Sequence, residues 1–273
     1  LWPRSAVELG VLSSPALVAF FERWERWSYR AADLVTCQTE GIADGVRGRE
    51  PGAVTFPYPN GVDTEFFEPG QRDPDVRARH GLPADANVIG YAGNFGRAQA
   101  LEQVIEAAAL LRDRTDVWFH LVGAGPCRDD VVERARSWHL ERVVFSPPVP
   151  RDEIPSLLGA WDASVVPLAD APVFEGARPS KMFELFAAGL PFVFCGRGEG
   201  AELARRSGGV TIVAPEQPQA LADALMGLVD AGPDVRRAEG EAARAFVVKE
   251  FDRKAIAERL EERLLELLTE GRP

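Results

Sequence analysis

Cysteine and histidine are scarce in this sequence of 273 residues, which limits the chemistry that it can support. The three cysteines (Cys37, Cys127 and Cys195) form no Cys-x-x-Cys pair and have no histidine neighbour at metal-binding spacing. Isolated cysteines in odd number predict free thiols in a reducing cytoplasm, not a disulfide framework. The three histidines are equally scattered, so we expect structural roles for them.

Long apolar runs and an excess of positive charge are also missing. No apolar run reaches the ~20 residues that a transmembrane helix needs, and no signal peptide is visible. The formal net charge is −11, which makes a nucleic-acid backbone an unfavourable partner. We therefore predict a cytoplasmic protein that binds no nucleic acid.

The sequence has no initiator methionine. It begins at Leu1, and its methionines are Met182 and Met226. We expect it to be a fragment of a longer chain or a processed product.

What the sequence does contain is a regular alternation of apolar runs and helical stretches, from about residue 70 to residue 250. The runs are apolar at consecutive positions, which is typical of parallel strands buried on both faces. A helical pattern follows each run, so we predict an α/β fold with a doubly wound, Rossmann-like domain and a parallel sheet. The six predicted strands are NVIGYAG, VWFHLVG, RVVFSP, DASVVPL, PFVFCG and VTIVA.

Residues 1–60 contain too few strands to form a comparable sheet. They predict a long helix with Trp24 and Trp27 on its apolar face, a helix from about residue 39 to 48, and two strands, DLVTC and AVTFPY. The tryptophans predict packing in a core or an interface. The turn-rich stretch PNGVDTEFFEPGQRD marks a boundary, so we expect residues 1–60 to be the end of a preceding domain.

In an open parallel sheet, ligands bind beyond the carboxyl ends of the strands, and three loops there have ambiguous patterns. In YAGNFGRAQA, glycines let backbone amides approach an anion, and Arg97 either reaches a phosphate or faces solvent. In LVGAGPCRDD the third glycine of a dinucleotide fingerprint is missing, which favours a structural turn. In SPPVPRDEIPSLL, the backbone at Val149 and Pro150 could hold a planar base.

The fourth loop, GARPSKMFELFAAGLPFVFCG, predicts a short helix that begins with a lysine. Lys181 adds positive charge to a terminus that is already positive, which costs ~0.3–1 kcal/mol unless an anion compensates it. At 100° per residue, Lys181 and Glu184 share one face, opposite Met182, Phe183, Phe186 and Ala187. We interpret this face as an anion site followed by a carboxylate for ribose hydroxyls. The alternative is a surface Lys181–Glu184 ion pair.

These segments resemble the retaining GT-B glycosyltransferases of family four, especially the bacterial surface-polysaccharide branch that transfers N-acetylated amino sugars. The resemblance covers essentially the whole chain. Its matching segments include YRAADLVTCQTEGI, FPYPNGVDTEFFEP, GYAGNFGRAQALEQVIEAAALL, FHLVGAGP and RPSKMFELFAAGLPFV, of which PNGVD and PSKMFE are the most specific. It implies two facing Rossmann-like domains, of which the N-terminal one would lack about 120 residues.

The resemblance also implies a domain assignment. Residues 1–60 would be the remnant of the N-terminal acceptor domain, and residues 61–250 would bind the nucleotide-sugar donor. Residues 251–273 would form a C-terminal helix that returns to the N-terminal domain.

Donor-site roles follow from the resemblance where the motifs match. Glu184 matches the second glutamate of the E-x7-E motif, which binds ribose. Gly176 stands where the first is expected. Either Glu175 replaces it as a sugar contact or this branch dispenses with the role, and we favour the latter. Asn94 and Gln99 stand where the first loop of the family usually has arginine and lysine. The remaining candidates for the diphosphate are Gly96, Arg97, Ser180 and Lys181.

The implied activity is that of a hexosyltransferase. It would move a sugar from a nucleoside-diphosphate donor, such as a UDP-sugar, to a glycan, lipid-linked or small-molecule acceptor with retention. We expect no cofactor or metal, because Lys181, the helix terminus and the GNFG amides would neutralise the leaving diphosphate. Peripheral contact with the inner membrane face would run through the missing N-terminal domain.

Two alternatives remain for the function. One is a non-catalytic nucleotide-sugar-binding fragment, because most of an acceptor domain would be absent. The other is a nucleotide-sugar 2-epimerase, against which the low histidine content argues.

Overall fold

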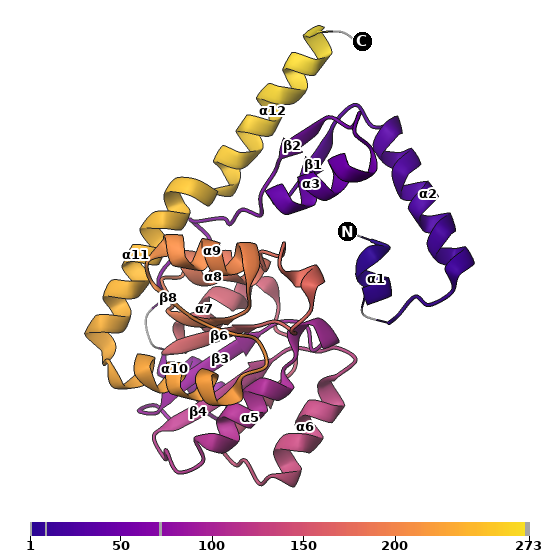
Figure 1. Ribbon diagram of the computed structural model, residues 1–273. Coiled ribbons are helices and arrows are strands. Elements are labelled where there is room, and N and C mark those ends of the chain that lie inside the picture. Colours follow the sequence, from indigo (N-terminus) through magenta and orange to yellow (C-terminus); the bar gives the residue numbers. More distant parts are fainter. Residues whose placement is uncertain (1, 9, 71–72, 271–273) are drawn as a thin grey trace.

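The centre of the protein is a six-stranded parallel sheet with the strand order β5-β4-β3-β6-β7-β8 (Figure 1). The computed structural model describes residues 2–8, 10–70 and 73–270. The strands are β3 (Asn87–Ala92), β4 (Val117–Val122), β5 (Val143–Ser146), β6 (Ala163–Pro167), β7 (Phe192–Cys195) and β8 (Val210–Val213). All six predicted strands form, and the α/β fold class is confirmed. The strand order reverses direction between β3 and β6, which makes their carboxyl ends the switch point of the sheet.

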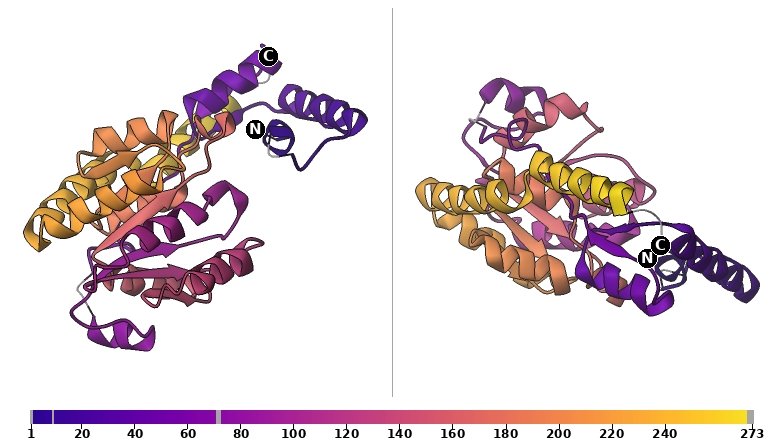
Figure 2. Two further views of the ribbon diagram at one scale, coloured as in Figure 1. Left: turned by 60° about the horizontal axis from the view of Figure 1, so that its bottom comes forward. Right: turned by 90° about the horizontal axis from the view of Figure 1, so that it is seen from above.

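Helices cover both faces of this sheet (Figure 2). Side chains alternate between two cores along each strand: Phe192 and Phe194 belong to one, Val193 and Cys195 to the other. Because both faces are buried, the strands are apolar at consecutive positions. One face carries α5 (Glu102–Leu110), α6 (Arg128–Ser137) and α10 (Pro218–Asp230), and the other carries α7 (Ile154–Gly159), α8 (Ser180–Ala187), α9 (Gly198–Ser207) and α11 (Pro233–Phe251).

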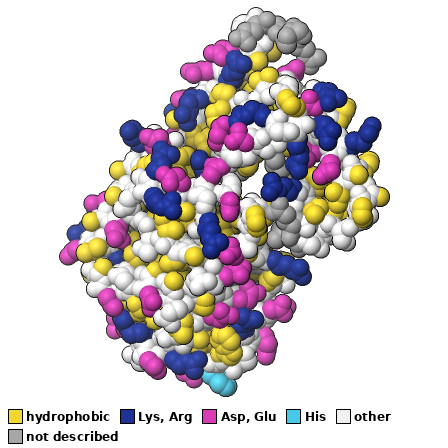
Figure 3. Space-filling view, in the orientation of Figure 1, with side chains coloured by type: hydrophobic (Ala, Val, Ile, Leu, Met, Phe, Trp, Pro, Cys, Tyr) yellow, Lys and Arg dark blue, Asp and Glu magenta, His cyan; other side chains and the backbone are white. Residues whose placement is uncertain are grey.

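The N-terminal segment forms a separate two-stranded parallel sheet. Its elements are α1 (Arg4–Glu8), α2 (Pro15–Ala31), β1 (Val35–Cys37), α3 (Glu40–Arg49) and β2 (Thr55–Pro57). No residue of α2 is buried, and Trp24 and Trp27 are 54% and 63% exposed. Packing of these rings in a core was therefore a wrong prediction, because nothing in the described chain covers this face. Hydrophobic and basic side chains lie next to one another on the exposed surface of α2 (Figure 3). Packing in an interface stays a prediction.

The chain bends at Asp252 between α11 and α12 (Arg253–Glu270). The segment after β2 forms hydrogen bonds to this bend. The Val62 amide donates to the Phe251 carbonyl at 3.0 Å, and the Arg253 amide donates to the Val62 carbonyl at 2.9 Å. The Thr64 hydroxyl donates to the Asp252 carboxylate at 2.8 Å. No helix in the described ranges combines the length and the apolarity needed to cross a bilayer.

The sequence patterns do not predict α4 (Pro74–Arg79), which is too short for periodicity to show. Its Arg77 is fully buried, and the guanidinium donates to the Asp162 carboxylate at 2.7 Å and to the Ala160 carbonyl at 2.8 Å. Asp162 also accepts the Val88 amide at 2.8 Å. This paired charge ties α4 to the beginnings of β3 and β6.

A polar chain crosses the core beside β3. The Trp161 indole Nε1–H donates to Nδ1 of His120 at 3.1 Å, and Nε2 of His120 lies 2.8 Å from the Ser146 hydroxyl. Ser146 lies 3.1 Å from Nδ1 of His80. Burial, and to a lesser extent the charge of His80, lowers the pKa of His120 to about 3. His80 and His120 thus have the structural roles that we expected of them.

The loops after β3 and β4 touch through their backbones at two glycines. Gly123 has φ +146°, and a Cβ added there would lie 1.9 Å from the Gly93 carbonyl oxygen. The Gly93 amide donates to the Val122 carbonyl at 2.9 Å, and the Phe95 amide donates to the Ala124 carbonyl at 2.8 Å. A side chain at Gly123 would separate the two loops.

We therefore expect Gly123→Ala to lower the free energy of unfolding by about 3 kcal/mol or more, since the methyl group collides with backbone that cannot rotate away. Gly227→Ala is the matched control, because this exposed glycine of α10 has nothing within 4 Å of an added Cβ. It should gain up to about 1 kcal/mol from helix propensity. Urea unfolding of both variants tests the contact, and equal stability for Gly123→Ala would contradict it.

The low pKa of His120 predicts a loss of stability in acid. Below the ordinary value of 6.5, the unfolded chain binds a proton that folded His120 takes up only near pH 3. His120 therefore lowers the stability by about 1.4 kcal/mol for each pH unit in this window. In urea unfolding at a series of pH values, His120→Gln should lose stability less steeply than the wild type. Equal slopes for His120→Gln and the wild type would refute the assignment.

Candidate functional site

A cavity of about 310 Å³ opens at the switch point of the sheet. It lies between the end of β3, the middle of β6, and helices α7 and α8. Its lining residues are Ala92, Gly93, Val149, Arg151, Ile154, Leu158, Trp161, Ser164, Val165, Lys181, Glu184 and Leu185. The cavity therefore brings together three residues predicted as ligand contacts: Val149, Lys181 and Glu184.

Lys181 enters this cavity from the first turn of α8. The helix begins at Ser180, one residue earlier than expected, and Met182, Phe183, Phe186 and Ala187 are buried as predicted. Burial lowers the pKa of the Lys181 ammonium to about 8, although the charge of Glu184 partly opposes the shift. Nζ of Lys181 donates to the Tyr91 hydroxyl at 3.2 Å and lies 4.5 Å from the centre of the Tyr91 ring.

Glu184 lies one turn further along α8 in the same cavity. Burial raises the pKa of its carboxyl group, while Lys181, Arg151 and Arg253 act in the opposite direction. Within the described chain, its carboxylate lies beyond the 4.0 Å limit of an ion pair with Lys181 and accepts no hydrogen bond. The alternative of a surface Lys181–Glu184 ion pair is therefore wrong, because the ammonium is turned onto Tyr91.

In the loop after β3, fewer backbone amides are free to bind an anion than we expected. Gly96 is buried, and its amide donates to Oε1 of Gln99 at 3.2 Å. The Gly93 amide donates to Val122 at the end of β4, and the Phe95 amide donates to Ala124 in the loop that follows it. Three of the four GNFG amides thus already have protein acceptors, since Gln99 and the neighbouring loop supply them. An anion contact at Gly96 stays a prediction and requires Gln99 to move.

The remaining predicted residues lie outside the cavity lining. Arg97 is exposed at the start of a 3₁₀ turn (Arg97–Gln99), and Ser180 is exposed at the first position of α8. Pro150 and Glu175 are also exposed, and the Glu175 carbonyl accepts the Glu199 amide at 2.7 Å. Their predicted contacts with the donor remain predictions.

Sequence reasoning missed three residues that shape the cavity. Tyr91 contacts Lys181, Trp161 forms part of the wall, and Arg151 lies near enough to Glu184 to affect its pKa. The Arg151 guanidinium also lies 5.5 Å from the centre of the Phe66 ring. The sequence could have indicated Arg151, because it directly follows Val149 and Pro150 in the loop after β5.

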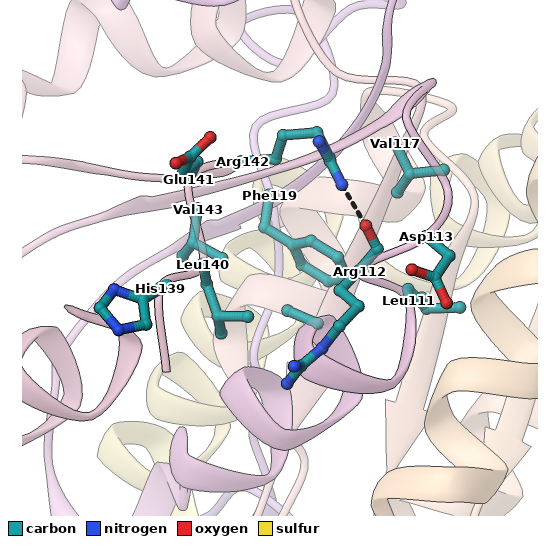
Figure 4. Close-up of a pocket in the computed structure, with 11 residues that line it drawn as sticks. Leu111, Arg112, Asp113, Val117, Phe119, His139, Leu140, Glu141, Arg142 and Val143 are labelled. Atoms are coloured by element: carbon teal, nitrogen blue, oxygen red, sulfur yellow. Dashed lines mark hydrogen bonds between the residues drawn. The ribbon is translucent and has the colours of Figure 1, made fainter. Parts of the chain in front are cut away.

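A second cavity, of about 230 Å³, lies at the opposite edge of the sheet (Figure 4). It is lined by Val117 and Val143, which begin β4 and β5, and the Arg142 guanidinium crosses its rim to the Arg112 carbonyl. The amino ends of parallel strands are not where such sheets bind ligands. We therefore place the functional site at the switch-point cavity.

A metal site would need several ligating side chains close together. Across residues 2–8, 10–70 and 73–270, no three His, Cys, Asp or Glu side chains come together as a metal site. That the reaction needs no metal stays a prediction.

Comparison with known proteins gives the family. The family model described as glycosyl transferases group 1 matches residues 86–231, which contain the whole cavity lining. The 2-deoxystreptamine glucosyltransferase of Streptomyces kanamyceticus is 31% identical over 83% of this chain and 59% of its own length. The putative colanic acid biosynthesis glycosyl transferase WcaI of Escherichia coli is 32% identical over 60% of this chain and 41% of its own.

The fold comparison agrees with the family match. The structure of Anabaena HepE in complex with UDP-glucose superimposes with a TM-score of 0.76 over 93% of this chain and 70% of that one, at 22% identity. The chain spans about half the length of the curated relatives that it matches. Since the family model covers more than half of the sequence, including the switch point, the chain belongs to the group 1 glycosyl transferases.

Proposed function

We propose that the protein is a hexosyltransferase that uses a nucleoside-diphosphate sugar and retains the configuration at the anomeric carbon. The observation that carries this proposal is a half-buried lysine ammonium at the positive end of a helix over the switch-point cavity, with no carboxylate of the described residues within ion-pair distance. A cation in that position attracts an anionic ligand. The family match and the names of the relatives support the transfer of a sugar.

The donor would occupy the cavity along its three predicted contacts. Its diphosphate would lie against Lys181, its ribose hydroxyls would donate to Glu184, and its base would lie near Val149. Ser180, Arg97 and a released Gly96 amide are additional candidates for the phosphates. We propose residues 61–250 as the donor-binding unit, because its sheet and helices supply every residue of the cavity.

The proposed chemistry places its main demand on the leaving group. Negative charge grows on the diphosphate as the bond to the sugar breaks, and a fixed cation in a dry site stabilises that charge strongly. Lys181 and the dipole of α8 would act on it together. We propose that they suffice without a metal.

We further propose an acceptor in bacterial surface-polysaccharide synthesis and an N-acetylated amino sugar as the donor sugar. Two relatives support the first part, since they are named for colanic acid and teichuronic acid biosynthesis. The resemblance to the amino-sugar branch supports the second. A glycan, lipid-linked or small-molecule acceptor would bind in the acceptor domain, to which we assign residues 1–60.

Removing either polar contact should weaken donor binding. We expect Lys181→Ala to raise the Kd for UDP about 10–100-fold, since it deletes a charge-assisted contact in a buried site. Glu184→Gln should raise it about tenfold, because an amide accepts the ribose hydrogens less strongly. Isothermal titration calorimetry with UDP and GDP measures both, with the exposed Lys249→Ala as the control. Unchanged affinity in both site variants would disprove the assignment.

Donor affinity should also depend on pH through Lys181. The free lysine loses its proton near pH 8, and a bound diphosphate favours the charged form. Binding therefore takes up a proton above that pH, and the affinity for UDP should fall up to about tenfold for each further pH unit. The phosphates do not interfere, because their last pKa is near 6. Calorimetry in buffers of different ionisation enthalpy detects the proton uptake; a flat profile in the wild type would count against the proposal.

A further inference from the structure

We infer that Tyr91 is the positioning residue of the donor site: its ring and hydroxyl hold the Lys181 ammonium over the cavity. The inference rests on the proposed function, in which Lys181 receives the diphosphate. It assigns to Tyr91 a role that no pattern in the sequence indicates, since the ring belongs to the core on the opposite face of the sheet from α8.

The contacts of Tyr91 join the lysine to the loop after β3. The Tyr91 hydroxyl donates to the Asn94 carbonyl at 2.6 Å and accepts from Nζ of Lys181 at 3.2 Å. One hydroxyl therefore has both its hydrogen and a lone pair engaged, which fixes its orientation. The ammonium lies 4.5 Å from the ring centre, within the range of a cation–π contact. Two separate interactions thus direct the same charge.

Gly93 supplies the space for this arrangement. A Cβ at Gly93 would lie 2.8 Å from Nζ of Lys181 and 3.1 Å from the Tyr91 hydroxyl. Gly93 has φ +154°, which disfavours a side chain in any case. A side chain at residue 93 would therefore push the end of the lysine away from its place against the ring.

An aromatic ring holds a cation without neutralising it. A carboxylate beside Lys181 would stabilise the ammonium better, but its negative charge would repel the diphosphate and would have to be displaced. The ring has no net charge, so the whole positive charge remains available to the ligand. Tyr91 is 1% exposed, and its place in the core keeps the lysine from swinging into solvent. The site therefore keeps a preorganised cation at a lower cost than a bare buried lysine would require.

The sequence makes a direct measurement practical, because it contains three lysines: Lys181, Lys249 and Lys254. The last two are exposed on α11 and α12. With both replaced by arginine, protein labelled with ¹³C at the lysine ε carbon reports Lys181 alone. Its NMR titration from about pH 6 to about pH 11 gives the Lys181 pKa directly, in the absence of any donor.

Three variants separate the contributions of Tyr91. Tyr91→Leu removes ring and hydroxyl, and should lower the Lys181 midpoint by about one pH unit. Tyr91→Phe keeps the ring and removes the hydroxyl, so its midpoint should lie between those of Tyr91→Leu and the wild type. Phe119→Leu is the matched control, since it deletes a buried ring of the neighbouring strand from the same core. Its midpoint should equal that of the wild type.

A titration with UDP completes the experiment. We expect UDP to raise the Lys181 midpoint in the wild type, and the Kd at pH 8 to rise about fivefold in Tyr91→Leu relative to Phe119→Leu. If Tyr91→Phe and Tyr91→Leu leave the ligand-free midpoint where Phe119→Leu leaves it, the role of Tyr91 is refuted. If the ligand-free midpoints shift as expected but neither UDP nor GDP moves that of the wild type, the proposed function fails instead.

Discussion

The backbone contact between Gly93 and Gly123 is the constraint on which the site depends. It joins the loop after β3 to the loop after β4, and the Gly123 amide extends the connection to the Ser146 carbonyl at 3.1 Å. The carboxyl ends of three neighbouring strands thus form one hydrogen-bonded layer. Because this layer sets the position of Gly93, it also sets the space into which the Lys181 ammonium fits. A shift of either loop would move Gly93 toward the Lys181 ammonium or away from it, and so would narrow or widen the space in which the ammonium lies.

The same layer explains why the positive charge of the site comes from a side chain. A glycine-rich loop can bind an anion through free amides, but here Gly93, Phe95 and Gly96 already donate to protein acceptors. The Gly93 and Phe95 amides hold the two loops together, and the Gly96 amide becomes free for a ligand only if Gln99 moves. In the proposed site the anion would therefore meet α8, whose dipole and lysine act at the same point. In our inference Tyr91 stabilises the charged form of Lys181, because burial alone would lower the pKa of the ammonium further.

Much of this arrangement could be predicted because it follows from rules with strong local signals. The apolar runs gave the six strands, and the rule for parallel sheets placed Lys181, Glu184 and Val149 at one edge. The contact between Tyr91 and Lys181 could not be predicted from the sequence. Tyr91 points into the core on one face of the sheet, and α8 packs on the other face. The two can meet only because Tyr91 lies near the end of β3, where the sheet no longer separates the faces. The hydrogen bond from the Gly96 amide to Gln99 could not be predicted either, since a bond between a side chain and the backbone produces no periodic pattern in the sequence. α4 has six residues, too few for a pattern, and the exposure of α2 depends on what covers it.

The polar chain beside β3 has a direction. An indole can only donate, so Trp161 obliges Nδ1 of His120 to accept, and the His120 proton must sit on Nε2. That proton points at the Ser146 hydroxyl oxygen, which lies 3.1 Å from Nδ1 of His80 and can either donate to it or accept from it. A single donor-only ring thus fixes the tautomer of the neighbouring imidazole. A protonated His80 would donate from Nδ1 to Ser146, whose hydroxyl oxygen would then accept from both histidines, while the hydrogen bond between Trp161 and His120 would keep its direction.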